Sequence, residues 1–108
     1  MRFNELDEIA DMVSLRSART GISNTVFIST KSYGRHAARI KIAVDPPDAF
    51  SAKAKNVTMV IHNFKIIGGQ LAPHIVKQAQ QFIARNRAVL LDYWEERIDT
   101  DQLLKRLK

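Results

Sequence analysis

Residues 38–44 are Ala38-Arg39-Ile40-Lys41-Ile42-Ala43-Val44, in which apolar side chains stand at every even-numbered position. Successive side chains of a β-strand point to opposite faces of the sheet, so this alternation predicts a strand with one apolar and one basic face. The strand must end at Asp45-Pro46-Pro47-Asp48, because proline cannot donate a ladder hydrogen bond. The segment therefore predicts a sheet that buries one face and exposes the other.

Strand-forming residues also flank this segment on both sides. Residues 24–30 are rich in β-branched and aromatic side chains, and residues 57–61 and 64–67 form a second apolar pair around His62-Asn63. Asparagine tolerates the positive φ that a tight hairpin turn needs. Short connections favour antiparallel pairing, and we expect three to four antiparallel strands within residues 24–67.

Helical spacing of apolar residues surrounds the predicted strands. Asn4 is a candidate cap for a helix over residues 5–16, and Pro73 fits the first turn of a helical region over residues 73–98, with Asn86 as a possible break. Asp99 or Thr100 is a candidate cap for a short helix within residues 99–108. The predicted fold is α+β, with an antiparallel sheet packed on one face by N-terminal and C-terminal helices.

Length and composition limit the class of protein. The chain has 108 residues, near the commonest size of one domain, so residues 1–108 are expected to share one core. It contains no cysteine, its first residues are acidic where a secretory signal is basic and then apolar, and its apolar runs are short. We expect a cytoplasmic protein without a membrane span. The histidines lack a metal-ligand spacing, so neither a metal nor a cofactor is expected.

Positive charge is concentrated in the middle of the chain. The formal charge is −3 over residues 1–11, +10 over residues 12–91 and −1 over residues 92–108. A field of this kind attracts phosphates or acidic protein surfaces. The expected basic surface, together with one tyrosine that could stack on a base, comprises Lys31, Tyr33, Arg35, His36, Arg39, Lys41, Lys53 and Lys55.

The basic surface leaves several interpretations open. It could be a solvated face that protects a sheet from aggregation, or a surface that engages nucleic acid or an acidic protein partner. A chain that inhibits or adapts another protein by occlusion is a further alternative. His36 between Arg35 and Arg39 is also the candidate acid–base group of a metal-independent ribonuclease, although no second acid–base group is evident.

The last third of the chain carries two apolar patterns. Trp94 and its neighbours are expected to fill the core between sheet and helix. The leucines beyond the main domain are expected to form an interface with a second copy of the chain, so a homodimer is a possible assembly. These interface residues are Leu103, Leu104 and Leu107.

Residues 57–96 carry a further pattern: a strand, the entry Gly69-Gln70-Leu71-Ala72-Pro73, and a helix in which Phe82-Ile83 and Leu90-Leu91 lead to Trp94. This pattern resembles a small bacterial family, domain of unknown function number four-one-six-zero. Members adjoin toxin–antitoxin or phage-derived genes, so the resemblance implies a regulatory or conflict-related role. The family's His-x-His-like segment is absent here, and no metal-binding or catalytic role follows from it.

Overall fold

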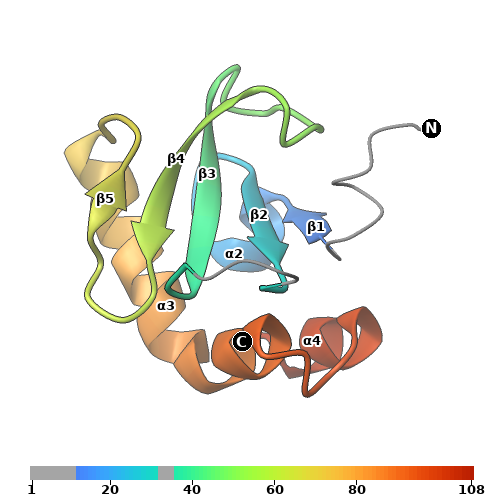
Figure 1. The fold of residues 1–108 in the computed structure, drawn as a ribbon. Helices are drawn as coiled ribbons and strands as arrows, with labels where there is room; N and C mark the ends of the chain where they lie inside the picture. The colour runs from blue at the N-terminus through green and yellow to red at the C-terminus, as the bar shows by residue number, and fades with distance from the viewer. Residues whose placement is uncertain (1–11, 32–35) are drawn as a thin grey trace.

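The computed structural model describes residues 12–31 and 36–108. Its centre is one five-stranded sheet in which every strand is antiparallel to its neighbours, in the order β1-β2-β3-β4-β5 (Figure 1). The strands are β1 (Met12–Leu15), β2 (Val26–Ser29), β3 (Arg39–Asp45), β4 (Lys55–Val60) and β5 (Ile66–Ile67). The α+β fold is confirmed, with five strands where three to four were expected.

Two of the three described helices lie behind one face of the sheet, and the last one lies beyond the ends of the strands (Figure 1). The helices are α2 (Ser17–Thr20), α3 (Pro73–Trp94) and α4 (Thr100–Arg106), and Figure 1 shows α3 crossing behind β4 and β5. Asp99 caps α4 as predicted: its side chain accepts from the Gln102 amide at 2.8 Å, and the Gln102 side chain accepts from the Asp99 amide at 3.0 Å. The face of the sheet opposite α3 is called the open face below.

The core lies between α3 and the sheet because the strands alternate as the sequence predicts. Ile40 and Ile42 are fully buried, and they share one cluster with Phe82 and Ile83 of α3. Trp94 is only 6% exposed, which confirms its placement as a buried residue. Burying one such aliphatic side chain contributes roughly 1.5–3 kcal/mol, so this layer supplies most of the stability.

The predicted helix over residues 5–16 is wrong at its C-terminal end. Met12–Leu15 is a strand that pairs with β2 in the register Met12↔Ser29 to Leu15↔Val26. Val13 and Leu15 stand two residues apart and both pack on the core, a period of two that overrides the helical spacing. Asn4 and the earlier part of the predicted helix lie outside the described residues.

The loop between β3 and β4 folds back over one end of the open face. Ala49 is buried in a second small cluster with Phe27 and Ala43, and Ala52 and Ala54 pack against it. The backbone amide of Thr25 also donates to the Pro47 carbonyl at 2.8 Å. Part of the open face is therefore covered, and the loop is fastened to β2 and β3.

The predicted break in α3 at Asn86 is confirmed. Asn86 has non-helical φ and ψ of −125° and 15°, and its side chain is buried. Its amide nitrogen donates to the carbonyls of Phe82 at 3.0 Å and Lys108 at 3.2 Å, and its oxygen accepts from the Lys108 amide at 2.7 Å. One side chain thus kinks α3 and holds the backbone that follows α4.

We predict that Asn86→Ala lowers the free energy of unfolding by about 1–3 kcal/mol, because it removes these hydrogen bonds and leaves a buried backbone group without its partner. Urea unfolding followed by circular dichroism measures the change. Gln81→Ala, at an exposed position on the same helix, is the matched control and should change the midpoint little. Equal midpoints for the two variants would contradict the structural role of Asn86.

Two glycines end the β4–β5 hairpin with positive φ, at +88° for Gly68 and +153° for Gly69. A Cβ atom at position 69 would lie 2.9 Å from Cγ2 of the buried Val57, whereas one at position 68 would meet no atom within 4 Å. Only position 69 therefore combines an unfavourable backbone conformation with a close approach.

We predict that Gly69→Ala lowers the free energy of unfolding by about 1–3 kcal/mol and that Gly68→Ala costs less. Both substitutions place an L-residue at positive φ, but Gly69→Ala does so at +153°, farther from the left-handed region than +88° at Gly68, and it alone adds the contact with Val57. Denaturant unfolding of the two variants side by side makes the measurement. A Gly68→Ala variant as unstable as Gly69→Ala would show that the contact is relieved without cost.

Candidate anion-binding face

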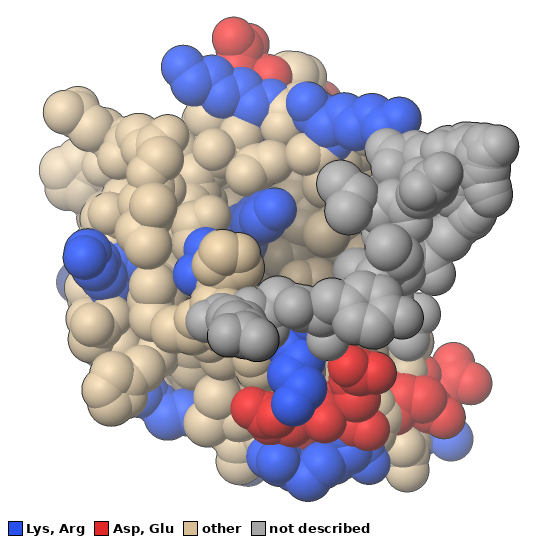
Figure 2. Space-filling model, in the orientation of Figure 1, with Lys and Arg blue, Asp and Glu red and all other residues tan. Residues whose placement is uncertain are grey.

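Arg39 and Lys41 stand on the open face because Ile40 and Ile42, which alternate with them, fill the core. Lys41 is paired in register with Phe27 of β2 and Thr58 of β4. Figure 2 shows Lys and Arg side chains in a hollow at the middle of this face. The two cations that the sequence placed together therefore project from neighbouring positions of one strand.

The floor around these cations is well packed. Phe27 and Thr58 beside Lys41 are buried, as is Val60 opposite Arg39, while Arg39 and Lys41 themselves are half-buried. Long basic side chains can pack their methylene groups on such a surface and keep the charged end in water. A charge held close to low-dielectric material interacts more strongly with an incoming anion than one on a freely solvated chain.

No ion pair within residues 12–31 and 36–108 involves Arg39 or Lys41. The Arg39 Nε atom donates to the Ala37 carbonyl at 3.0 Å, which fixes the direction of the side chain without neutralising it. The three ion pairs between described residues use Lys31, Arg97 and Arg106. Arg39 and Lys41 are thus not paired with a carboxylate from the described part of the chain.

The other predicted binding residues divide into groups. His36 is exposed at the entry to β3, whereas Lys53 and Lys55 are exposed at the opposite end, in the loop and at the start of β4. Seven strand residues separate these ends by roughly 20 Å. Tyr33 and Arg35 lie outside the described residues.

Lys31 belongs to a different environment from the one the sequence predicts. Its Nζ atom lies 2.7 Å from Oε1 of Glu95, and its backbone amide donates to the Trp94 carbonyl at 2.9 Å. The hydrogen bond from Lys31 lowers the pKa of Glu95. Lys31 is therefore neutralised at the end of α3 and leaves the predicted basic surface.

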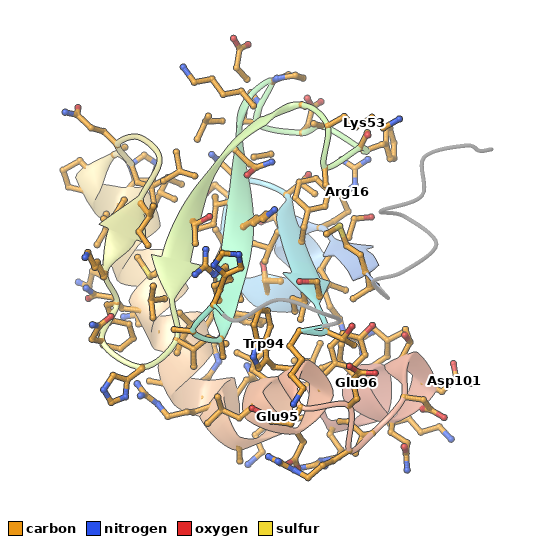
Figure 3. The ribbon with its side chains drawn as sticks, in the orientation of Figure 1. Arg16, Lys53, Trp94, Glu95, Glu96 and Asp101 are labelled. Carbon is orange, nitrogen blue, oxygen red and sulfur yellow. The ribbon has the colours of Figure 1, made fainter. Side chains whose placement is uncertain are left out.

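Acidic residues gather where α3 ends and α4 begins. Figure 3 places Glu95, Glu96 and Asp101 along this corner, where Figure 2 shows carboxylates over α4. The acidic corner comprises Asp92, Glu95, Glu96, Asp99 and Asp101. This group of carboxylates lies away from β3 and is interspersed with Lys and Arg side chains (Figure 2).

Asp92 links the two helices of this corner. Its Oδ1 atom is 2.9 Å from Nε of Arg97, and its Oδ2 atom is 3.0 Å from a guanidinium nitrogen of Arg106. The hydrogen bond from Arg97, and next that from Arg106, lower the pKa of Asp92 below its ordinary value of 3.8. The carboxylate therefore favours the folded state when it is ionised.

We predict a loss of stability with acid that depends on Asp92. A carboxyl group whose pKa is lowered by folding contributes fully above its unfolded pKa, and the contribution disappears as the pH falls below 3.8 through the folded pKa. Asp92→Asn should flatten the dependence of the melting temperature on pH in this range, whereas Glu96→Gln should not. Parallel pH profiles for native chain and Asp92→Asn would contradict the assignment.

The predicted interface leucines pack within their own chain. Leu103 is fully buried in the main core, and Leu104 and Leu107 pack against the same cluster. Because α4 packs against α3, the fully buried Leu103 is not free to contact a second copy, while Leu104 and Leu107 remain partly exposed. The homodimer itself stays a prediction.

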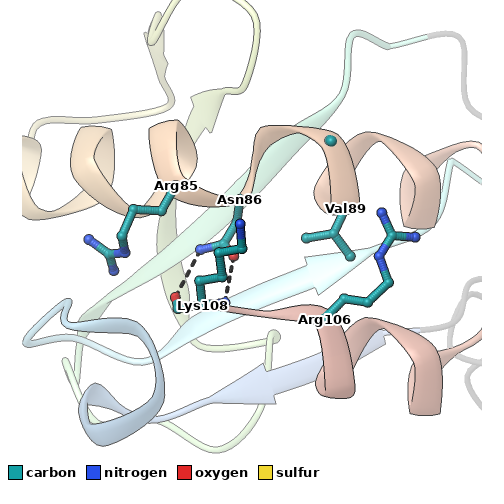
Figure 4. A pocket seen from close by; sticks show the side chains of 6 residues that line it. Arg85, Asn86, Val89, Arg106 and Lys108 are labelled. Carbon is teal, nitrogen blue, oxygen red and sulfur yellow. Dashed lines mark hydrogen bonds between the residues drawn. The ribbon is translucent and has the colours of Figure 1, made fainter.

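A cavity of about 250 Å³ lies at the kink of α3 (Figure 4). Its polar side chains already serve the fold: an Arg85 guanidinium nitrogen donates to the Thr20 carbonyl at 2.9 Å, Arg106 pairs with Asp92, and Asn86 binds the Lys108 backbone. Across the described ranges, no group of three histidine or acidic side chains could hold a metal ion. We therefore place the candidate site on the open face.

Sequence reasoning missed Arg16 and Phe50. Phe50 is 80% exposed on the β3–β4 loop, and the guanidinium carbon of Arg16 lies 3.9 Å from the centre of its ring. An Arg16 guanidinium nitrogen also donates to the Asp48 carbonyl at 3.2 Å. The signal was an aromatic residue in a linker of small and polar residues, where no apolar period accounts for it.

Comparisons with protein-family models, with curated proteins and with solved structures find no match to this chain. The resemblance over residues 57–96 therefore remains a prediction from the residues that carry it. No helix in the described ranges is both long enough and apolar enough to cross a membrane.

Proposed function

We propose that this chain is a non-enzymatic module that binds nucleic acid through the open face of its sheet. The observation that carries the proposal is the pair Arg39 and Lys41, which project from that face and have no carboxylate partner among the described residues. Cations of this kind gain affinity for phosphates by releasing the counterions that surround a nucleic acid.

The spread of the basic residues favours a linear polyanion over a compact one. Arg39 and Lys41 occupy the middle of the sheet and its His36 end, while Lys53 and Lys55 lie toward the far end of β3 and β4. A phosphate backbone carries charge at regular intervals along its length, so one strand can meet both groups in turn. An acidic protein partner would have to present carboxylates over the same distance.

The ribonuclease alternative receives less support. His36 is exposed, and no hydrogen bond within the described ranges joins it to another acid–base side chain. A general base that cleaves RNA at the 2′-hydroxyl must be positioned within hydrogen-bond reach of that group, and a second group must serve the leaving oxygen. A binding role, in the regulatory context that the family resemblance implies, needs only the basic face.

We predict that the native chain binds RNA or DNA at low salt and that affinity falls as salt rises. The double variant Arg39→Gln/Lys41→Gln should weaken binding roughly tenfold or more at about 50 mM salt. It should also reduce the slope of log affinity against log salt by about 0.7 for each lost single-strand contact. Fluorescence anisotropy with labelled oligonucleotides measures both quantities.

The matched control is Lys77→Gln/Lys105→Gln, which removes the same net charge from exposed positions on α3 and α4. If the two double variants lose affinity equally, the net charge and not the open face governs binding. If the native chain binds no nucleic acid at low salt, the proposed function is overturned. Retention on an immobilised acidic protein then tests the alternative that the partner is an acidic protein.

A further inference from the structure

We infer that Phe50 is a stacking platform for an unpaired base, so the nucleic acid that this chain binds is single-stranded. The inference rests on the proposed function and adds to it the class of ligand. Three described large apolar side chains are exposed: Met12 at 40%, Ile67 at 39% and Phe50 at 80%. Phe50 stands out because it is twice as exposed as the other two.

The backbone that carries Phe50 is held in place. Its neighbour Ala49 is buried against Phe27 and Ala43, and the Ala49 amide donates to the Pro46 carbonyl at 3.2 Å. On the C-terminal side of Phe50, the Ala54 amide donates to the Ser51 carbonyl at 3.1 Å. The loop therefore holds the ring in water before any partner binds. A partner then loses little free energy to ordering this loop on binding.

Arg16 supports the ring from one side. Its guanidinium lies over the ring at 3.9 Å from the centre, and the hydrogen bond to the Asp48 carbonyl joins the same arginine to the loop. A cation over one face of a phenyl ring is attracted by the negative charge of the π-system. Because the ring is 80% exposed, a base can approach the face that Arg16 leaves open.

The charges around the ring suit a nucleotide. Arg16 and Lys53 lie at the same end of the sheet as the ring's loop (Figure 3), and the acids there are Asp45 at the end of β3 and Asp48 in the loop. The local balance, with Lys55 included, remains positive. A base on Phe50 would place its phosphates within reach of these cations, in the arrangement by which single-strand-binding proteins combine stacking with a basic groove.

The ring also extends the basic face. Arg16 directly follows β1, whose Ser14 is paired with Phe27, and Phe27 is paired with Lys41. Two strand spacings of about 4.8 Å, together with two residues of about 3.3 Å each along the strand from Ser14 to Arg16, bring the backbone of Arg16 to roughly 12 Å from that of Lys41. A short stretch of single strand can therefore contact Lys41 and Phe50 together.

The full-length chain and its variants are titrated at about 50 mM salt with two labelled RNAs, a single strand of about 12 nucleotides and a hairpin duplex with the same number of phosphates. Phe50→Ala should weaken single-strand binding by roughly fivefold to a hundredfold, and duplex binding and the salt slope should stay unchanged. Phe50→Trp should keep or strengthen single-strand binding. Ile67→Ala, a second exposed apolar residue at the far edge of the sheet, should bind like the native chain.

The outcomes separate this inference from the proposed function. If Phe50→Ala binds single strands as tightly as the native chain while Arg39→Gln/Lys41→Gln binds weakly, nucleic-acid binding stands and the stacking inference is overturned. Equal losses of single-strand and duplex affinity in Phe50→Ala also overturn it, because a base in a duplex cannot leave the stack at small cost. If the native chain binds neither these RNAs nor DNA of the same lengths, both proposals fail together.

Discussion

The burial of Ile40 and Ile42 against α3 is the constraint on which the rest of the molecule depends. These two side chains fix which face of β3 is turned inward, and the two-residue period then turns Arg39 and Lys41 outward. A shift of one residue in the pairing with β2 and β4 would exchange the two sets and bury both cations. The energy that stabilises the core is therefore also the energy that holds the basic residues toward solvent.

The ion pairs between described residues lie near the end of α3 and on α4, away from Arg39 and Lys41 of β3. Two carboxylates of the acidic corner form ion pairs between described residues: Glu95 pairs with Lys31, and Asp92 pairs with Arg97 and Arg106. Exposed ion pairs of this kind contribute little to stability, commonly below about 1 kcal/mol each. Their larger consequence here is electrostatic: Asp92 and Glu95 are paired near α4, and no ion pair among the described residues involves Arg39 or Lys41.

The fold was predictable wherever one period dominated. Alternation identified β3, the hairpin turn identified β4 and β5, and Asn86 and Asp99 identified the kink of α3 and the cap of α4. The strand at Met12–Leu15 was mistaken for the end of a helix because four residues satisfy both periods, and pairing with β2 decides between them. Leu103 was misplaced because local spacing cannot show that α4 turns back onto the core.

The candidate site was predictable only in part, for the same reason. Arg39 and Lys41 share a face because they stand two residues apart on one strand. The ion pair between Lys31 and Glu95, in contrast, joins residues that are 64 positions apart in the sequence. Arg16 and Phe50 meet through a loop whose path is set by tertiary packing. Sequence periodicity carries information about neighbours within an element and little about contacts between distant ones.

The β3–β4 loop packs its alanines over Phe27, so the position of the proposed binding residues on this loop depends on a buried side chain that a ligand cannot contact. Phe27 is buried beneath Ala49, and the segment above it bears both the exposed ring and Lys53. A smaller side chain at position 27 would let that segment sink or tilt, which would redirect the ring while every surface residue kept its identity. A substitution that changes the volume of the side chain at position 27 could therefore alter the orientation of the exposed ring without any substitution at the surface.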